Sequence, residues 1–415
     1  MRSEVVKLKK SKRKTRYSAI LLTMGILLSG CTQGSQIEPE QPAEKPVVIE
    51  YDKKLEGELE GRWYYDHLSI EEQELYNVIY QGYLDFKPEI KLDGVDKKVL
   101  SKVTTVIDLE RPELYYVSSS YGYTFYENDK NKVYSIRPQY LMNKERYEAE
   151  MVKVDEVVDE LIAKIKKQDM GEYEAELYMH DYLVNKIEYD NENQEKGVDV
   201  FRNLYGAFVN GKANCMGYAR AMTYVMNKLG IQCASIIGDT YKASGKTGKH
   251  EWNIIKINGD WYHLDICWDD PSYIDELNIE KKKDPKEIKH TFFNVSDSDI
   301  SQTRNWNDTL GRAGEPPLCS AKKFNYYTVN DAIITSTDHF QEVLNENIQR
   351  MMNEGVGIEV RFTDQEDYKK VQKDFSLHIK NAMKKINYFG TYSYGWSPDA
   401  RMYVMNIHVT SVVDK

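Results

Sequence analysis

Cysteine is scarce in this sequence: it accounts for five of 415 residues, and no two cysteines are spaced as CxxC. This spacing excludes a zinc site built on CxxC pairs and a dense disulfide framework. Internal repeats are also lacking, and the apolar run over residues 19–28 is too short to span a bilayer as a helix. The composition is that of a globular protein, and the length favours two or three domains.

The N-terminus has the pattern of a targeting segment. Eight basic residues precede the apolar run, and Leu28-Ser29-Gly30-Cys31 resembles the lipobox of bacterial lipoproteins. The resemblance implies a signal peptide over residues 1–30 and lipidation of Cys31, followed by a flexible tether over residues 31–55. We therefore expect a lipid-anchored, extracytoplasmic protein on the outer face of the bacterial cell membrane. An uncleaved signal anchor is the alternative.

Positive charge is also in deficit. The chain has 56 basic and 66 acidic residues, a net charge of −10; without residues 1–30, which hold eight basic residues and one acidic residue, the counts are 48 and 65, a net charge of −17. A body this acidic argues against binding to nucleic acid or to anionic lipid. Membrane contact would then depend on the lipid alone.

Residues 56–168 are predicted to form a mixed α/β N-terminal region. Ser69-Ile70-Glu71-Glu72 has the form of a capping box, so a helix is expected to begin there. Residues 115–137 alternate in polarity around a polar centre at 127–130, which indicates a β-hairpin. From Val154 onward apolar residues keep helical spacing, which predicts a long amphipathic helix. This region carries no catalytic pattern.

Residues 321–415 are predicted to form a small α+β C-terminal domain. The expected order is strand 326–334, helix 340–352, strand 356–362, helix 368–386 and a hairpin that turns at Ser397-Pro398-Asp399. A central domain, residues 169–320, lies between the two flanking regions and begins with a helix near residues 172–187. The whole chain is thus expected to belong to the α+β class.

The central domain carries a cysteine at the start of a predicted helix. After Cys215, small or apolar residues recur with helical spacing until Gly230, and Asn214 is a preferred N-cap residue. Cys215 would then occupy the first helical position, where unpaired amides and the helix dipole favour a thiolate and could hold an oxyanion. Position alone is a weak indication, because cysteine is also a common core residue.

A base and an orienting carboxylate follow on a predicted hairpin. Asn258-Gly259 is a strong two-residue turn signal between strands 250–257 and 260–266. The register set by this turn places His250 and Asp265 diagonally on one face of the sheet, within reach of a side-chain hydrogen bond. With the helix cysteine they supply a nucleophile, a base and the group that orients the base.

These motifs together resemble the transglutaminase-like superfamily, which shares a papain-like cysteine fold. The resemblance covers roughly residues 172–271 and includes the Gly-x-x-x-Cys approach to the helix, His250-x-Trp252 and Trp261-x-x-x-Asp265. It implies a papain-like central domain, in which the helix with the cysteine packs on an antiparallel sheet. It further implies that Cys215, His250 and Asp265 are a catalytic triad acting on a glutamine or peptide carbonyl through a thioester. Tyr205 is a candidate oxyanion donor.

Other residues remain open to different interpretations. His263 falls on the predicted face of Asp265 and could act as the base in another register, whereas Cys233 and Cys267 are expected to pack in the core. Four acidic residues, Asp269, Asp270, Asp275 and Glu276, lack the spacing of a calcium loop, so no metal or other cofactor is expected. The remaining histidines are assigned structural or surface roles: His67, His180, His290, His339, His378 and His408.

The sequence thus predicts a lipid-anchored, transglutaminase-like cysteine enzyme. Its substrate would be a protein or peptide, such as a cell-wall or surface protein, whose acyl group passes to an amine or to water. Transamidation and hydrolysis are both open, because the outcome depends on whether loops exclude water. The alternative is a catalytically silent surface lipoprotein that uses the fold as a protein- or cell-wall-binding module.

Overall fold

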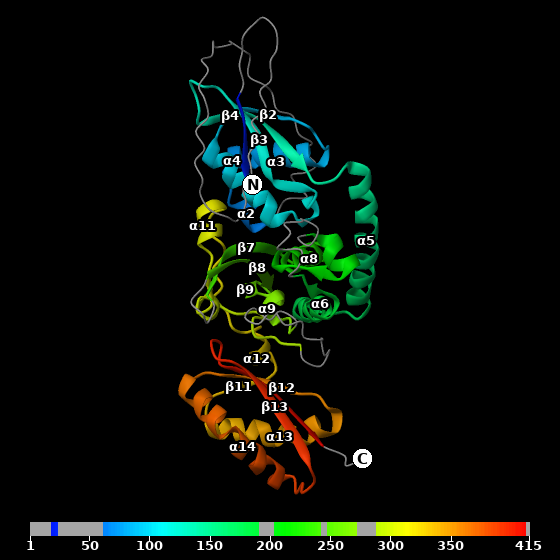
Figure 1. Cartoon of the computed structure of the whole chain (residues 1–415), viewed down its shortest axis with the longest axis vertical. Coiled ribbons are helices and arrows are strands. Elements are labelled where there is room, and N and C mark those ends of the chain that lie inside the picture. The colour runs from blue at the N-terminus through cyan, green and yellow to red at the C-terminus, as the bar shows by residue number, and fades with distance from the viewer. Residues whose placement is uncertain (1–17, 24–60, 191–202, 242–246, 272–287, 412–415) are drawn as a thin grey trace, which may run out of the picture.

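The structure, a computed structural model, describes residues 18–23, 61–190, 203–241, 247–271 and 288–411. Three units follow one another along its long axis, from the N-terminal unit at the top of Figure 1 to the C-terminal unit at the bottom. Cys31, the predicted tether and the acidic residues Asp275 and Glu276 lie outside the described residues. No helix within the described ranges is long and apolar enough to cross a membrane.

The N-terminal unit is a four-stranded antiparallel sheet with two packed helices, α3 and α4, beside it. The strand order is β1-β3-β4-β2. The edge strand β1 comes from the segment predicted to be the signal peptide. The elements are β1 (Ser18–Thr23), α2 (Trp63–Asp66), α3 (Ile70–Leu84), β2 (Ile90–Asp96), α4 (Lys97–Glu110), the short 3-10 helix η1 (Pro112–Leu114), β3 (Val117–Phe125) and β4 (Lys132–Tyr140).

Local sequence signals in this unit are confirmed. The Ser69 hydroxyl accepts a hydrogen bond from the Glu72 amide (3.2 Å), and the Glu72 carboxylate accepts one from the Ser69 amide (2.9 Å), so the capping box begins α3 as predicted. Strands β3 and β4 are the predicted hairpin. The predicted long helix is α5 (Lys144–Lys167), which begins well before Val154 because the Asn143 side chain caps it at the Arg146 amide (3.1 Å).

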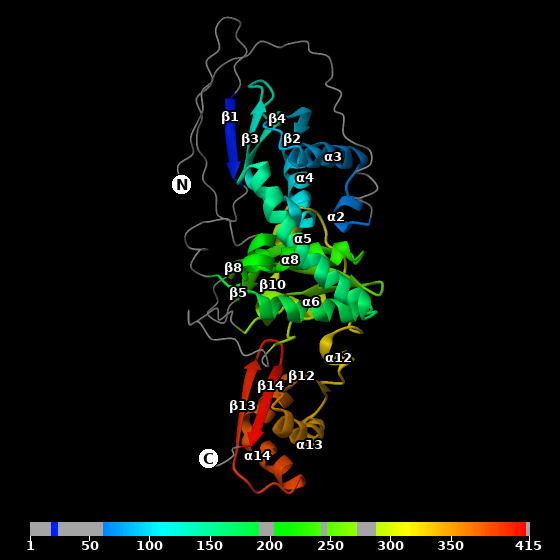
Figure 2. The ribbon, with the colours of Figure 1, turned by 90° about the vertical axis from the view of Figure 1, so that its right-hand side faces the viewer.

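Helix α5 runs beside both the N-terminal and the central unit (Figure 2). In its middle, Asp155 accepts hydrogen bonds from Tyr224 Oη (2.7 Å) and Lys228 Nζ (2.6 Å), which lie on helix α8 (Cys215–Lys228). Near its start, the Tyr147 ring lies 4.1 Å from the ring of Tyr116 in the N-terminal unit. The helix therefore holds the two units together.

The central unit has the predicted arrangement, with α8 packed on an antiparallel sheet of order β10-β7-β8-β9. Buried apolar side chains of α8, including Met222 and Met226, belong to the same cluster as Ile255 and Ile257 of β8. The elements around α8 are α6 (Glu172–Lys186), β5 (Glu188–Tyr189), the π-helix η3 (Gly206–Asn210), β6 (Lys212–Ala213), β7 (Cys233–Tyr241), β8 (Thr247–Ile257), β9 (Asp260–Leu264), α9 (Ile266–Asp269), α10 (Asp297–Ile300), β10 (Arg304–Asn305) and α11 (Asn307–Arg312).

The C-terminal unit is α+β, with the sheet order β11-β12-β14-β13 and two long helices packed together. Its helices pack through buried residues such as Phe340 and Phe375. Its elements are α12 (Tyr326–Val329), β11 (Ile333–Ile334), α13 (Thr337–Glu354), β12 (Ile358–Phe362), α14 (Gln365–Lys385), β13 (Tyr392–Asp399) and β14 (Val404–Ser411).

Two local predictions for this unit are wrong. Residues 326–329 form helix α12 rather than a strand, because the Asn325 side chain accepts a hydrogen bond from the Tyr327 amide (3.3 Å) and caps the helix. The hairpin does not turn at residues 397–399, which belong to β13. The turn comes later, because Asp399 Oδ1 accepts the amides of Arg401 (2.9 Å) and Met402 (3.1 Å).

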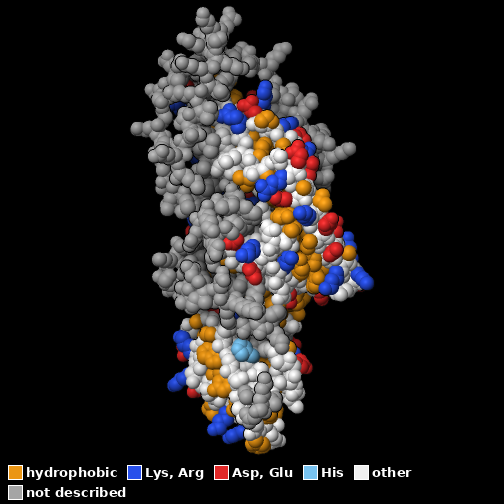
Figure 3. Space-filling view, turned by 45° about the vertical axis from the view of Figure 1, so that its right-hand side comes forward, with side chains coloured by type: hydrophobic (Ala, Val, Ile, Leu, Met, Phe, Trp, Pro, Cys, Tyr) orange, Lys and Arg blue, Asp and Glu red, His pale blue; other side chains and the backbone are white. Residues whose placement is uncertain are grey.

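Charged side chains of both signs are interspersed on the molecular face shown in Figure 3. Among the described residues visible there, the basic side chains are not gathered into one patch. A clustered basic surface is the usual electrostatic footprint of a nucleic-acid-binding protein. This face offers no such footprint.

Candidate active site

Cys215 lies at the first position of α8, as its sequence context predicts. The Asn214 side chain caps the helix by accepting the amides of Met216 (3.1 Å) and Gly217 (3.4 Å). The cysteine is half-buried, whereas the following turns of the helix are buried in the core. The helix thus holds the thiol at the edge of the core, with its side chain still partly accessible.

The hairpin opposite α8 has the register that its turn predicts. Asn258 and Gly259 both have positive φ (49° and 95°), as a two-residue turn of this type requires, and Ile257 pairs with Asp260. The ladder ends at Leu264, two residues before the predicted end of the strand. It ends there because Asp265 caps α9, accepting the Trp268 amide at 3.2 Å. The prediction that this strand continues to residue 266 is therefore wrong.

His250 and Asp265 nevertheless meet. His250 Nε2 lies 2.7 Å from Asp265 Oδ2, and both side chains are nearly inaccessible to solvent, at 4% and 1% exposed. The Cys215 thiol lies close enough to the His250 ring to act on its pKa. Because Nε2 faces the carboxylate and carries the proton, Nδ1 is the ring nitrogen left to accept the thiol proton. The structure thus brings all three predicted residues together.

The surroundings of His250 favour a neutral imidazole. Burial lowers the pKa of His250, and the Arg304 guanidinium acts in the same direction, whereas the nearby Cys215 acts to raise it. A neutral ring at physiological pH is a proton acceptor. The site is therefore arranged so that His250 can take the proton of Cys215.

Arg304 is a member of the site that the sequence did not reveal. Its Nη1 donates to the same oxygen of Asp265 that faces His250, and its side chain is fully buried. The guanidinium carbon lies 4.3 Å from the centre of the Trp268 ring and 4.5 Å from that of Phe292. Burial and Arg401 act to lower the pKa of Arg304, but a guanidinium retains its proton in proteins, and the carboxylate favours the charged form. Arg304 is thus a fixed cation behind the carboxylate.

Gly238 on β7 allows Arg304 to reach this position. Strand β10 pairs with β7 through Arg304 opposite Thr240 and Asn305 opposite Asp239. A Cβ atom on Gly238 would overlap the backbone carbonyl of Asn305 and lie 2.9 Å from the Cα of Trp306. Only glycine lets the two strands approach so closely.

The alternative candidates have other partners. Trp252 Nε1 donates to His263 Nδ1 (3.1 Å), and His263 Nε2 lies 2.8 Å from Asp297, so both ring nitrogens are engaged away from Cys215. Cys233 and Cys267 are buried, as expected for packing residues. The contact shown for Tyr205 is with Lys153 on α5, whose ammonium lies 5.8 Å from the ring centre, and its role as an oxyanion donor stays a prediction.

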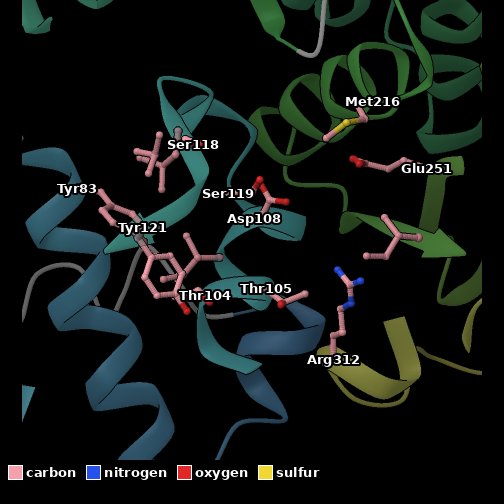
Figure 4. A pocket seen from close by; sticks show the side chains of 14 residues that line it. Tyr83, Thr104, Thr105, Asp108, Ser118, Ser119, Tyr121, Met216, Glu251 and Arg312 are labelled. Atoms are coloured by element: carbon pink, nitrogen blue, oxygen red, sulfur yellow. The ribbon is translucent and has the colours of Figure 1, made fainter. Parts of the chain in front are cut away.

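A pocket of about 80 Å³ lies between the N-terminal and central units (Figure 4). Thr104 and Asp108 line it from α4, and Met216 and Glu251 line it from the central unit. Because Met216 is in the first turn of α8, the pocket lies beside that turn, but Cys215 and His250 are not among its lining residues. Arg220 of α8 forms ion pairs with Asp108 (2.8 Å) and Glu251 (3.6 Å) and so links the two walls.

The comparisons with known proteins agree with this geometry. Residues 159–266 match the family model of the transglutaminase-like superfamily. The central unit is a transglutaminase-like domain. The match ends immediately after Asp265 and includes Cys215 and His250. Members of this superfamily are generally cysteine enzymes, which include transglutaminases and cysteine proteases.

Two solved structures resemble parts of the chain. One is a crystal structure of a TGase, 13% identical, which covers 52% of this chain and 51% of its own, with a TM-score of 0.26. The other is a candidate cysteine protease from Cytophaga hutchinsonii, 16% identical, which covers 28% of this chain and 37% of its own, with a TM-score of 0.23. The chain thus spans at most about half of either protein, and neither likeness carries a functional argument. No curated protein matches the chain significantly.

Proposed function

We propose that the protein is a cysteine acyltransferase or peptidase that uses Cys215, His250 and Asp265 as its catalytic residues. The observation that carries this proposal is the buried pair of His250 and Asp265, with Nε2 2.7 Å from Oδ2, beside the half-buried thiol of Cys215. The same three residue types act together wherever a thiol nucleophile needs a base and the base needs an orienting group. The transglutaminase-like domain supports this proposal.

The first step would form a thioester. His250 Nδ1 takes the proton from Cys215, the sulfur forms a bond to the carbonyl carbon of a glutamine side chain or a peptide, and His250 then gives that proton to the departing nitrogen as the C–N bond breaks. In the second step an amine or water attacks the thioester and transfers a proton to His250. The thiol recovers this proton when the C–S bond breaks. Asp265 holds the imidazole orientation and balances its transient positive charge.

The oxyanion would be held at the start of α8. The Met216 and Gly217 amides are engaged by the Asn214 side chain, whereas the Cys215 amide precedes the first intrahelical hydrogen bond. We therefore assign the oxyanion to the Cys215 amide, supported by the positive end of the helix dipole. Tyr205 stays the candidate for a second donor.

The pocket beside Met216 and Glu251 is the proposed site for part of the substrate. Its wall from the N-terminal unit carries the hydroxyls of Thr104, Thr105, Ser118 and Ser119. The same wall also carries Ile107, Leu114 and Val117, so the lining suits a group with both polar and apolar parts. The N-terminal unit would then contribute to substrate choice.

An acyl-transfer assay tests the proposal. The protein is incubated with a glutamine-rich protein and a fluorescent primary amine, and both amine incorporation and peptide release are followed. We expect one of these activities in the wild type and in Cys233→Ala, which removes a buried thiol away from the site, but not in Cys215→Ala or His250→Ala. No activity, together with equal thiol reactivity in the wild type and His250→Ala, would instead favour a binding module.

We also propose that Cys31 anchors the protein to the outer face of the bacterial membrane. The support is the lipobox pattern at residues 28–31 after a basic and apolar N-terminus. Metabolic labelling with a fatty acid should mark the wild type but not Cys31→Ala. An unlabelled wild-type protein that remains in the cytoplasm would contradict the anchor, and with it the expected surface substrates.

A further inference from the structure

Two buried histidines converge on one carboxylate at the boundary of the central and C-terminal units. His180 and Asp181 are neighbours on α6, and His290 lies in the segment that precedes α10. His180 Nδ1 lies 2.9 Å and His290 Nε2 lies 3.0 Å from the same oxygen, Asp181 Oδ1. Both imidazole side chains are buried, whereas that of Asp181 is 39% exposed.

The other nitrogen of each ring is held by a second carboxylate. His180 Nε2 lies 3.3 Å from Asp269, and His290 Nδ1 lies 3.0 Å from Glu359 of β12. Both carboxylates are fixed by further hydrogen bonds: Asp269 accepts the Phe292 amide (3.0 Å), and Glu359 accepts the hydroxyl of Tyr327 (2.7 Å). Every ring nitrogen of the pair therefore faces a carboxylate oxygen.

Neutral imidazoles cannot satisfy this arrangement. A neutral ring has one N–H donor and one lone pair, so each ring would direct a lone pair at an oxygen that can only accept. If Asp269 and Glu359 take the two N–H groups, both lone pairs point at Asp181. A cation shared by the two lone pairs and the Asp181 carboxylate resolves the conflict. Without a cation the cluster must hold extra protons, either as a pair of imidazolium rings with centres 5.0 Å apart or with a protonated carboxyl group facing one ring.

A second histidine cluster in the same domain shows the contrast. His263, Asp297 and Cys319 also lie close together. There, however, the Trp252 N–H, which can only donate, faces His263 Nδ1, so His263 Nε2 carries a proton and donates it to Asp297. Burial also raises the pKa of Cys319, which disfavours the thiolate. A single neutral tautomer satisfies that cluster, and it has no lone pair to offer.

We propose that His180, Asp181 and His290 bind a divalent transition metal ion of the zinc type. Their ligand atoms all lie within 4.8 Å of one another. Two imidazoles and one carboxylate suit zinc better than magnesium or calcium, which prefer sets of oxygen ligands. Asp269 and Glu359 occupy the positions from which carboxylates orient metal-bound histidines. The exposed side of Asp181 gives the ion access and room for a solvent ligand.

The metal would link two parts of the protein. Two ligands lie on α6 of the transglutaminase-like domain, whereas Glu359, which orients the third, belongs to the sheet of the C-terminal unit. Asp269 lies on α9, the helix that Asp265 caps. Metal binding would therefore stabilise the contact between the C-terminal unit and helices α6 and α9 of the central unit. This effect does not depend on the thioester chemistry.

Metal titration of the chelator-treated full chain tests the proposal. We expect one Zn²⁺ or Co²⁺ per chain, with tetrahedral-type visible absorption for Co²⁺, and a rise in Tm of roughly 5 °C at about 100 times Kd. Mg²⁺ and Ca²⁺ should produce neither effect. Glu359→Gln should weaken binding about 10- to 100-fold, and Asp181→Asn and His290→Gln should weaken it further.

The controls separate this site from other thiols and histidines. His263→Gln and Cys215→Ala should bind Co²⁺ like the wild type, and because Asp181 is partly exposed, Asp181→Asn tests the ligand set even if His290→Gln fails to fold. Absence of saturable binding, or binding unchanged in Asp181→Asn, would overturn the proposal and leave a cluster that holds extra protons. None of these readouts depends on enzymatic activity, so failure of the proposed function would leave this test intact.

Discussion

Replacing Asp265 with asparagine tests the contacts around His250 most sharply. Asp265 Oδ2 accepts from His250 and Arg304, and Oδ1 accepts from the Trp268 amide. An asparagine side chain offers one oxygen and one NH₂ group to these three donors. In either orientation at least one buried N–H loses its acceptor, which should lower the free energy of unfolding by about 1–3 kcal/mol.

The effect on activity should be larger than the effect on stability alone suggests. Without the carboxylate charge, an imidazolium at His250 would face the Arg304 guanidinium with no anion between them. At an effective dielectric constant of about 20, a unit charge a few ångströms away is worth about 3–4 kcal/mol. This energy corresponds to a loss in kcat/KM of about 10²- to 10³-fold. If the amide nitrogen faces His250, the tautomer is also reversed, and the loss is greater still.

The matched control is Asp297→Asn. Asp297 holds His263 Nε2 at 2.8 Å, much as Asp265 holds His250, but away from Cys215. Urea unfolding and initial rates of amine incorporation or peptide release would be measured for both variants. We expect both to lose stability and only Asp265→Asn to lose activity. An Asp265→Asn protein within threefold of wild-type activity, with Cys215→Ala inactive, would refute the assigned role of the carboxylate.

Three other predictions concern Gly238, the glycine of β7 that lies against β10, the buried carboxyl group of Glu110, and the oxyanion. Gly238→Ala should displace β10 and reduce both thermal stability and activity. Gly311→Ala, whose Cβ meets no atom within 4 Å, lies in helix α11 and should reduce neither; equal losses in both variants would contradict the role assigned to Gly238. Burial raises the pKa of Glu110 to about 7 from its ordinary value of 4.5. Between these two pH values the folded state binds a proton that the unfolded state has released, so the free energy of unfolding falls as the pH rises from about 4.5 to about 7. Glu110→Gln should remove up to about 3 kcal/mol of this pH dependence in urea unfolding at pH 5 and pH 8, whereas Glu113→Gln should retain it; an unchanged slope in Glu110→Gln would count against the raised pKa. Tyr205→Phe should lower kcat about tenfold or more at unchanged alkylation of Cys215 if the hydroxyl holds the oxyanion, and an unchanged kcat would exclude it.

Features with a local cause could be predicted from the sequence. The two-residue turn at Asn258-Gly259 sets the hairpin register, and that register alone brings His250 toward Asp265. Asn214 caps α8 through its own side chain, which places Cys215 at the helix start. These contacts join residues close in the chain, so spacing and residue type were sufficient.

Features with a distant cause could not be predicted. Arg304 reaches Asp265 only because β10 pairs with β7 across Gly238, and no pattern around residue 304 marks it. The sequence predicts only structural or surface roles for His180 and His290, because His290, Asp269 and Glu359 join the cluster from separate parts of the chain. The end of β9 was misplaced by two residues, because the cap of α9 competes there with strand pairing.

The rate at which iodoacetamide alkylates Cys215, measured from about pH 5 to pH 9, shows whether His250 takes the proton of this thiol. Cys215 in the wild type should react fast near pH 7, where the neutral His250 can take its proton and an ordinary thiol is still mostly protonated. His250→Ala should remove this reactivity, whereas Asp297→Asn should preserve it. If the alkylation rate falls tenfold per pH unit below about pH 8 and is the same in the wild type and His250→Ala, His250 does not act as the base for Cys215.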